Sequence, residues 1–266
     1  MTALPDGAAQ VLADPGLTGA VVIVTGAGSG IGAATARRAG AAGARVVLVG
    51  RRPEPLDEVA GEIRSAGGEA LVLPADLADP ASPGRVVRSS LDRYGRIDGL
   101  VNNAAVVRHK PLGEWDVAGF DEHVATNIRA PFFLIQEALP ALRESPVRSV
   151  VNISSSSGTL HRTGQSVYAM TKSALDYLTR TLAGELAPLG VRVNGIAPGP
   201  IDTPIHATWA DDLEEAYRWL GRQVPLGRIG APDEVALWIV LLLSPMASFL
   251  TGAVIPLDGG QVIDRE

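Results

Sequence analysis

The chain has 266 residues, 46% of them hydrophobic, which is enough for one large α/β domain with a sizeable core. It contains no cysteine, which excludes disulfides and thiolate metal sites, and its four histidines lack the paired spacing of a zinc site. The net charge of -6 argues against nucleic acid as a partner, because such a surface repels phosphate backbones.

Residues 1–16 contain scattered prolines and glycines without an apolar period, so we expect a flexible leader and not a secretory signal. Beyond it, β-branched runs alternate with helical stretches. The predicted strands cover 20–24, 45–49, 70–73, 99–102, 148–153, 191–196 and 253–257. The predicted helices cover 31–42, 55–66, 85–94, 120–143, 167–186 and 234–243, and Pro131 is able to bend the fourth. This alternation predicts that 17–266 form a single domain, a doubly wound (Rossmann) α/β sheet of about seven parallel strands with helices on both faces.

Two segments interrupt the alternation, at 108–119 and 199–232. Long excursions after strands are where open α/β sheets build binding sites. The most apolar stretch, 235–243, is shorter than the roughly 20 residues that cross a bilayer, so we expect a cytoplasmic protein without a membrane partner.

A glycine-rich turn directly follows the first predicted strand. Its residues are Thr25, Gly26, Gly28, Ser29, Gly30, Ile31 and Gly32. Glycines let the backbone turn tightly and approach a diphosphate, and the next helix directs its free N–H groups at that anion. The turn therefore predicts a dinucleotide cradle.

The end of the second predicted strand indicates which dinucleotide is preferred. An NAD-binding protein usually has an acidic residue there, on the ribose 2′-hydroxyl. This chain has Arg51 and Arg52 instead, and the first carboxylate is Glu54. We expect the arginines to hold a 2′-phosphate, so that NADP(H) is preferred and NAD(H) is the alternative.

Further motifs resemble the short-chain dehydrogenase/reductase family over about 17–260. The turn at 25–32 is similar to its TGxxxGIG motif, 102–105 to its NNAG segment with Ala105 in place of glycine, and 257–260 to its last strand and turn. The resemblance implies four catalytic residues, Asn127, Ser155, Tyr168 and Lys172. It also implies cofactor contacts at Asp76, Leu77, Asn103, Ala104, Tyr168, Lys172, Pro198, Gly199, Ile201 and Thr203.

Tyr168 and Lys172 are four residues apart and so share one face of a helix. A free phenol has a pKa of about 10, and a nearby ammonium favours the phenolate, so we expect Lys172 to lower the pKa of Tyr168. For reduction, Ser155 would hold the substrate carbonyl and Tyr168 would protonate it while the nicotinamide delivers hydride. The resemblance implies that Lys172 binds the nicotinamide ribose and that Asn127 positions a water that returns protons to Lys172.

Substrate contacts are expected from Ser155, Tyr168, His161 and Trp209, the last in a lid at about 203–225. The lid is apolar but carries acidic residues at 211, 212, 214 and 215, which would disfavour an anionic substrate if they face inward. We expect a ketone reductase for a small, neutral, moderately apolar substrate. The alternatives are an NAD-linked alcohol dehydrogenase, a 3-oxoacyl thioester reductase and, less favoured, a non-catalytic dinucleotide-binding protein. The resemblance also implies a homotetramer, with a dimer as the alternative.

Overall fold

The computed structural model describes residues 15–208 and 212–263, and seven parallel strands of these residues form one sheet. The strands are β1 (Val21–Thr25), β2 (Arg45–Gly50), β3 (Glu69–Pro74), β4 (Gly99–Asn102), β5 (Ser149–Ile153), β6 (Arg192–Pro198) and β7 (Val254–Leu257). Their order across the sheet is β3-β2-β1-β4-β5-β6-β7. This order confirms the predicted doubly wound α/β fold. The predicted leader lies almost entirely outside the described residues.

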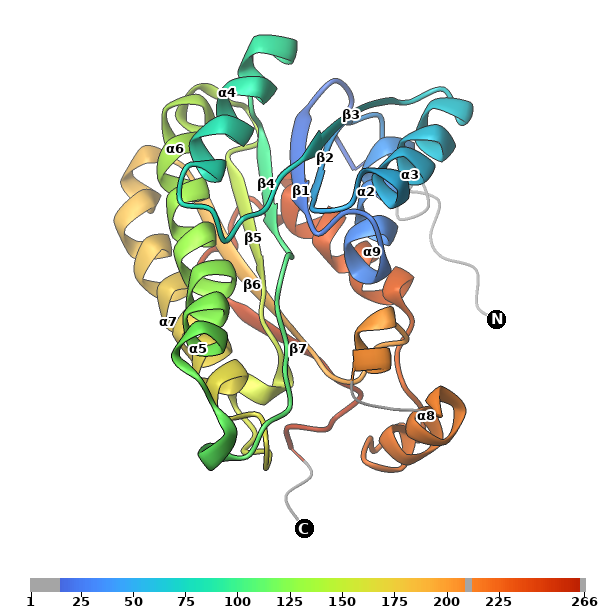
Figure 1. The fold of residues 1–266 in the computed structure, drawn as a ribbon. Helices are drawn as coiled ribbons and strands as arrows, with labels where there is room; N and C mark the ends of the chain where they lie inside the picture. The colour runs from blue at the N-terminus through green and yellow to red at the C-terminus, as the bar shows by residue number, and fades with distance from the viewer. Residues whose placement is uncertain (1–14, 209–211, 264–266) are drawn as a thin grey trace.

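Helices cover both faces of the sheet (Figure 1). One layer consists of α2 (Gly30–Ala41), α3 (Pro53–Ser65) and α9 (Pro232–Leu243), and the other of α4 (Ser82–Tyr94), α6 (Ala130–Glu144) and α7 (Ser166–Leu186). Of the two shorter helices, α8 (Leu213–Arg222) lies in the interrupting segment at 199–232. The other, α5 (Val117–Val124), begins at the end of the segment at 108–119 and continues into the predicted helical region at 120–143. None of the described helices is long and apolar enough to cross a membrane.

The apolar runs of the strands supply the core on both sides of the sheet. In β1, Val22 and Val24 pack into the layer of α2, α3 and α9, whereas Val21 and Ile23 pack into the opposite layer. All four side chains are buried. Successive side chains of a strand point to opposite faces, so a strand covered on both sides needs an apolar residue at every position.

The helical region predicted at 120–143 differs in detail, because it consists of three segments and not of one bent helix. A π turn, η2 (Ala125–Arg129), separates α5 from α6, and in it the Ala130 N–H donates to the Ala125 carbonyl. Pro131 lies in the first turn of α6 and has no N–H to donate to the Asn127 carbonyl four residues earlier. The α-helical hydrogen-bond ladder is therefore interrupted before the proline, within the π turn.

The sheet reverses its direction of winding between β1 and β4, which pair directly although β2 and β3 lie between them in the sequence. In open α/β sheets, ligands bind in the crevice outside the carboxyl ends of the strands at this point. The predicted site segments follow the carboxyl ends of β1 to β6. Parallel pairing therefore brings them all to one edge of the sheet.

Candidate active site

A cavity of about 940 Å³ is built from the segments that follow the strands. The predicted site residues that line it are Gly26, Gly28, Ser29, Gly30, Ile31, Arg51, Arg52, Asp76, Leu77, Asn103, Ala104, Ser155, His161, Tyr168, Lys172, Pro198, Gly199, Ile201 and Thr203. Thr25, Gly32 and Asn127 are buried and do not line it, and Trp209 lies outside the described residues. Apart from Thr25, Gly32 and Asn127, the structure thus brings the predicted cofactor and catalytic residues to the lining of one cavity.

The turn after β1 requires glycine for two physical reasons. Gly26 and Gly30 have φ angles of 65° and 53°, a region that residues with a Cβ rarely adopt. A Cβ on Gly32 would lie 2.2 Å from the Gly26 carbonyl oxygen, so Gly32 acts through close packing and not through contact with the cavity. Ser29 begins α2 without a side-chain capping bond, which leaves N–H groups of the first turn available to an anion. This cradle fits the diphosphate of a dinucleotide.

Thr25 and Asn103 join the turns that follow β1 and β4. The Thr25 hydroxyl donates to the Val101 carbonyl at 3.1 Å and accepts the backbone N–H groups of Asn103 and Ala104 at 2.9 and 3.0 Å. The Asn103 side-chain amide donates to the Thr25 carbonyl at 2.8 Å. Thr25, a predicted cofactor residue, therefore shapes the cradle from behind it.

The end of the cavity beside β2 and β3 is positively charged. Arg51 and Arg52 are exposed and line the cavity, and neither forms an ion pair among the described residues. Asp76 follows β3 and accepts the Ala78 N–H at 2.9 Å through one carboxylate oxygen. Two unpaired guanidinium groups beside a strand that ends without a carboxylate fit the 2′-phosphate of NADP.

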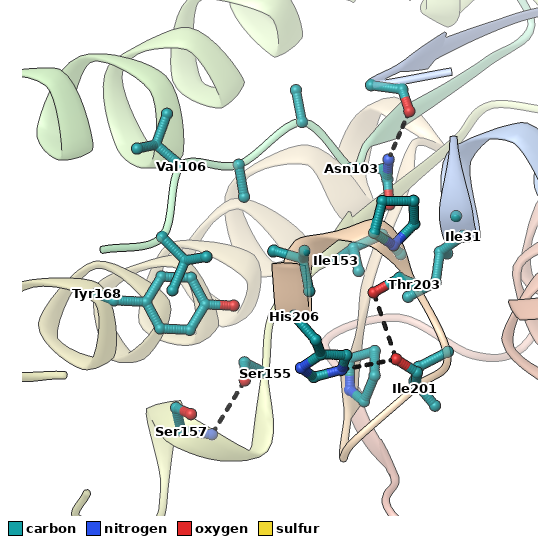
Figure 2. Close-up of a pocket in the computed structure, with 18 of the residues that line it drawn as sticks. Ile31, Asn103, Val106, Ile153, Ser155, Ser157, Tyr168, Ile201, Thr203 and His206 are labelled. Carbon is teal, nitrogen blue, oxygen red and sulfur yellow. Dashed lines mark hydrogen bonds between the residues drawn. The ribbon is translucent and has the colours of Figure 1, made fainter. Parts of the chain in front are cut away.

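Tyr168 and Lys172 lie on one buried face of α7, as their spacing predicts. The Lys172 Nζ is 5.7 Å from the centre of the Tyr168 ring and donates to the Ile153 carbonyl at 2.7 Å. The Ser155 hydroxyl lies close enough to the Tyr168 phenol to lower its pKa, and it accepts the Ser157 N–H at 3.1 Å. Figure 2 shows Tyr168 and Ser155 around the same pocket. A phenol, a hydroxyl and an ammonium therefore gather beside the cradle.

Burial, and not the ammonium, sets the protonation of Tyr168. Loss of hydration raises the pKa of the phenol, and the nearby Ser155 hydroxyl opposes only part of this rise. The expectation that Lys172 lowers the pKa of Tyr168 is therefore wrong for this cavity. Burial also removes water from the ammonium of Lys172, and this lowers its pKa to about 8. Near pH 7 the phenol is neutral and can donate a proton.

Asp176 continues the four-residue spacing along α7 and is buried one turn beyond Lys172. Its negative charge raises the pKa of Lys172 and so opposes the effect of burial. Burial raises the pKa of Asp176 itself, and the nearby Ser154 hydroxyl and the charges of Arg180 and Lys172 oppose that rise. Sequence analysis missed Asp176, although the repeated spacing was a signal for it.

The side-chain amide of Asn127 forms its hydrogen bonds within the protein. Its amide oxygen accepts the Val106 N–H at 2.8 Å, and its amide nitrogen donates to the Val106 carbonyl and the Thr171 hydroxyl, both at 3.0 Å. The side chain therefore positions the segment after β4 against α7. Because Pro131 has no N–H, the backbone carbonyl of Asn127 receives no hydrogen bond from the residue four positions later. The role of Asn127 in positioning a water stays a prediction.

The other serines of the run after β5 hold the surrounding loop. Each donates its hydroxyl to a group of another segment. The acceptors are the Lys172 carbonyl for Ser154, the Gln261 amide oxygen for Ser156 and the Gln165 amide oxygen for Ser157, at 3.2, 2.9 and 2.8 Å. Ser155 is thus the serine of this run that acts on the pKa of the Tyr168 phenol.

Sequence analysis also missed residues in the substrate half of the cavity. They include Val106, His109, Arg162, Gln165 and Gln261. Arg162 and Gln165 lie between Ser155 and Tyr168 in the chain, and that nearness was an available signal. Gln261 comes from beyond β7, so only the fold brings it to the cavity.

The predicted lid at 203–225 contains the short helix η5 (Pro204–Thr208) and α8. Its residues Ile205, His206, Trp219 and Leu220 line the cavity. The acidic side chains at 212, 214 and 215 are exposed and do not line it. Asp212 instead caps α8 by accepting the Glu215 N–H at 3.0 Å. The described acidic residues of the lid therefore do not oppose an anionic substrate, and closure of this segment stays a prediction.

Comparisons with known proteins agree with this site. The family described as Enoyl-(Acyl carrier protein) reductase (adh_short_C2) matches residues 26–261. The chain is 36% identical over 244 residues to the 2,5-dichloro-2,5-cyclohexadiene-1,4-diol dehydrogenase LinX of Sphingobium indicum, with 92% of this chain and 96% of that protein covered. It is 37% identical over 247 residues to the 3-oxoacyl-(acyl-carrier-protein) reductase FabG of Thermotoga maritima, with 93% and 99% covered.

A solved structure from Beutenbergia cavernae, an NAD(P) dependent enzyme with NADP bound at low occupancy, is also similar. It matches with a TM-score of 0.87 and 35% identity over 94% of this chain and 99% of that chain. Fold, site and relatives place the chain among the NAD(P)-dependent oxidoreductases that act on CH–OH groups. Within that class it belongs to the short-chain dehydrogenase/reductase family.

Replacing Asp176 with Asn should lower the pKa of Lys172 below about 8, because the substitution removes the charge that opposes burial. Lys172 would then lose its proton at a lower pH. We expect the alkaline fall in kcat/KM for ketone reduction to move to lower pH. The measurement is the pH profile of reduction in wild-type protein and Asp176→Asn. Glu185→Gln, an exposed carboxylate on the same helix, is the control and should keep the wild-type profile. An unshifted profile in a folded Asp176→Asn protein would contradict this account.

Proposed function

We propose that the chain reduces the ketone of a small, moderately apolar substrate, with NADPH as the preferred cofactor and NADH as a weaker one. The observation that supports this direction best is the buried Tyr168 phenol. Its raised pKa keeps it protonated, and it lies beside Ser155 in the cavity that holds the dinucleotide cradle. A neutral phenol is a proton donor, which carbonyl reduction requires, whereas alcohol oxidation needs a proton acceptor.

In the proposed mechanism, Ser155 donates a hydrogen bond to the substrate oxygen, and Tyr168 transfers its proton to the same oxygen. The cofactor, when bound, supplies hydride to the carbonyl carbon. Lys172 holds the Ile153 carbonyl with one N–H and has two further donors, which suit the hydroxyls of the nicotinamide ribose.

Two alternatives use the same residues. The Sphingobium relative is a dehydrogenase of a diol, and the reverse reaction with NAD would make this chain an alcohol dehydrogenase. The Thermotoga relative is a 3-oxoacyl-(acyl-carrier-protein) reductase, which favours a thioester substrate as the second candidate. A non-catalytic role is disfavoured by the intact cluster of Ser155, Tyr168 and Lys172. Ketones, alcohols and 3-oxoacyl thioesters, each assayed with both cofactors, separate these functions.

Tyr168→Phe should reduce turnover by about a hundredfold to ten-thousandfold, because the ring stays but the proton donor is lost. Cofactor affinity should stay near the wild-type value. Steady-state reduction and calorimetric titration with NADPH measure the two effects. Tyr177→Phe removes an exposed hydroxyl from the same helix and serves as the control. Wild-type turnover in Tyr168→Phe would refute the proposed role.

Arg51→Asp should lower kcat/KM for NADPH by about tenfold or more, because a charge-assisted contact to the 2′-phosphate is replaced by repulsion. The value for NADH should be retained or rise, since a carboxylate can accept from the ribose 2′-hydroxyl. Parallel assays with the two cofactors measure the ratio. Arg143→Asp, an exposed position on α6 outside the cavity, is the matched control. An unchanged cofactor ratio in Arg51→Asp would count against the preference for NADP.

We also propose a cytoplasmic location and a homotetramer, with a dimer as the alternative. Phe132 and Phe133 on α6 and Tyr177 on α7 expose much of their rings, and contact between copies would remove them from water. Light scattering at micromolar concentration should give about four times the chain mass of 27.6 kDa. A monomer at that concentration would exclude the assembly.

A further inference from the structure

An arginine without a counter-charge lies in the substrate half of the cavity. Arg162 is half-buried, lines the cavity and forms no ion pair or side-chain hydrogen bond among the described residues. Burial lowers its pKa, and no neighbouring carboxylate opposes that effect. A partly buried guanidinium usually has an anionic or hydrogen-bonding partner, because loss of hydration is costly for a charge that cannot be neutralised. The missing partner therefore indicates a ligand.

The surroundings of Arg162 are basic and neutral, and none of them supplies the missing charge. Burial lowers the pKa of His109, and the charges of His206 and Arg162 lower it further, which means that these basic groups are near one another. Gln165 joins them, with its amide nitrogen 3.2 Å from the His109 Nε2. The cavity lining contains one carboxylate among the described residues, Asp76, which follows β3 at the opposite end.

An acid that acts on His206 does not supply this charge either. Asp202 raises the pKa of His206 and hydrogen-bonds Tyr217, but it is exposed and does not line the cavity. Asp202 also has no effect on the pKa of Arg162, which burial alone lowers. The positive charge of Arg162 is therefore uncompensated within the described structure.

A second polar group in the same cavity also lacks a partner. The Gln261 side chain is 4% exposed, and its amide oxygen accepts the Ser156 hydroxyl at 2.9 Å. Its amide nitrogen is buried and has no hydrogen-bond partner among the described residues. A buried donor without a partner costs free energy, and Gln261 is one of the residues that line the cavity.

We infer that the substrate half of the cavity binds the carboxylate of an oxo acid or hydroxy acid, and that Arg162 is the residue that recognises it. The inference rests on the proposed reduction at Ser155 and Tyr168 and names the substrate class for that same site. One guanidinium together with neutral donors balances one negative charge, which suits a carboxylate better than a phosphate carrying nearly two. Such a substrate is anionic at one end, unlike the neutral substrate expected from the sequence.

The place of Arg162 in the chain explains why this residue is suited to select the substrate. Arg162 lies between Ser155 and Tyr168 in the chain, so the recognising charge and the reacting groups are held by one short segment. A guanidinium can grip a carboxylate through two parallel hydrogen bonds, which fixes its orientation as well as its position. Binding at Arg162 would thus restrict how the substrate ketone is presented to Ser155 and Tyr168.

The test compares Arg162→Gln, Arg162→Lys and wild-type protein on matched pairs of ketones. Each pair is an oxo acid and its primary amide, for example 4-oxocyclohexanecarboxylate and 4-oxocyclohexanecarboxamide, followed by NADPH consumption. We expect wild-type protein to prefer acid over amide by about tenfold or more in kcat/KM. Arg162→Gln should lose about tenfold to a hundredfold on the acids and less than about threefold on the amides. Arg162→Lys should retain part of the preference, and the control Arg143→Gln all of it.

A binding measurement separates this inference from the proposed reaction. Calorimetric titration of NADP-saturated protein with cyclohexanecarboxylate and with cyclohexanecarboxamide reports recognition without turnover. We expect the carboxylate to bind more tightly than the amide in wild-type protein, and Arg162→Gln to abolish that difference. Two results would overturn the inference while the proposed function survives. Ketones would be reduced but neither experiment would distinguish acid from amide, or Arg162→Gln would reduce the acids as well as the wild-type protein does. If Tyr168→Phe keeps wild-type turnover while carboxylate binding still depends on Arg162, the proposed function fails and the anion site stands.

Discussion

The crevice of this protein depends on the hydrogen bonds that tie β1 to β4 where the winding of the sheet reverses. The strands pair, but the segments that follow them depart toward opposite layers of helices, and a gap opens between the two turns. The Thr25 hydroxyl and the Asn103 amide bridge these turns from behind. They hold the glycine cradle at a fixed distance from the segment that leads on to Val106. Without that constraint the two halves of the cavity would have no defined relation.

Burial is the second physical determinant, and it acts on every titratable group of the reacting cluster. It raises the pKa of Tyr168 and lowers that of Lys172 to about 8, so both groups shift toward their neutral forms. Asp176 and the Ile153 carbonyl limit the loss of charge on Lys172. The cluster is therefore ready to give a proton before any ligand is bound. A positive group introduced next to the phenol would change this balance, because it would favour the phenolate.

The cavity lining is positively charged, although the chain as a whole is negatively charged. The chain carries a net charge of -6, yet the described lining of the cavity holds one carboxylate and several arginines. Arg51 and Arg52 stand at the end beside β2, and Arg162 stands near the reacting groups. None of the three has an ion-pair partner among the described residues. Unpaired guanidinium groups at both ends of one cavity fit ligands that carry negative charge at both ends.

The sequence by itself determined the fold and the cofactor turn of this protein, because both depend on local rules. Continuous β-branched runs specify strands buried on both faces, and Gly26, Gly30 and Gly32 specify a backbone path closed to other residues. The pairing of Tyr168 with Lys172 also follows from helical spacing alone. Only the tertiary structure decided that burial outweighs the ammonium at Tyr168, that a π turn interrupts the helix at Asn127, and that Gln261 and Arg162 share a cavity. These outcomes depend on how much water each group loses and on which distant segments meet, and neither quantity is encoded in the spacing of neighbouring residues.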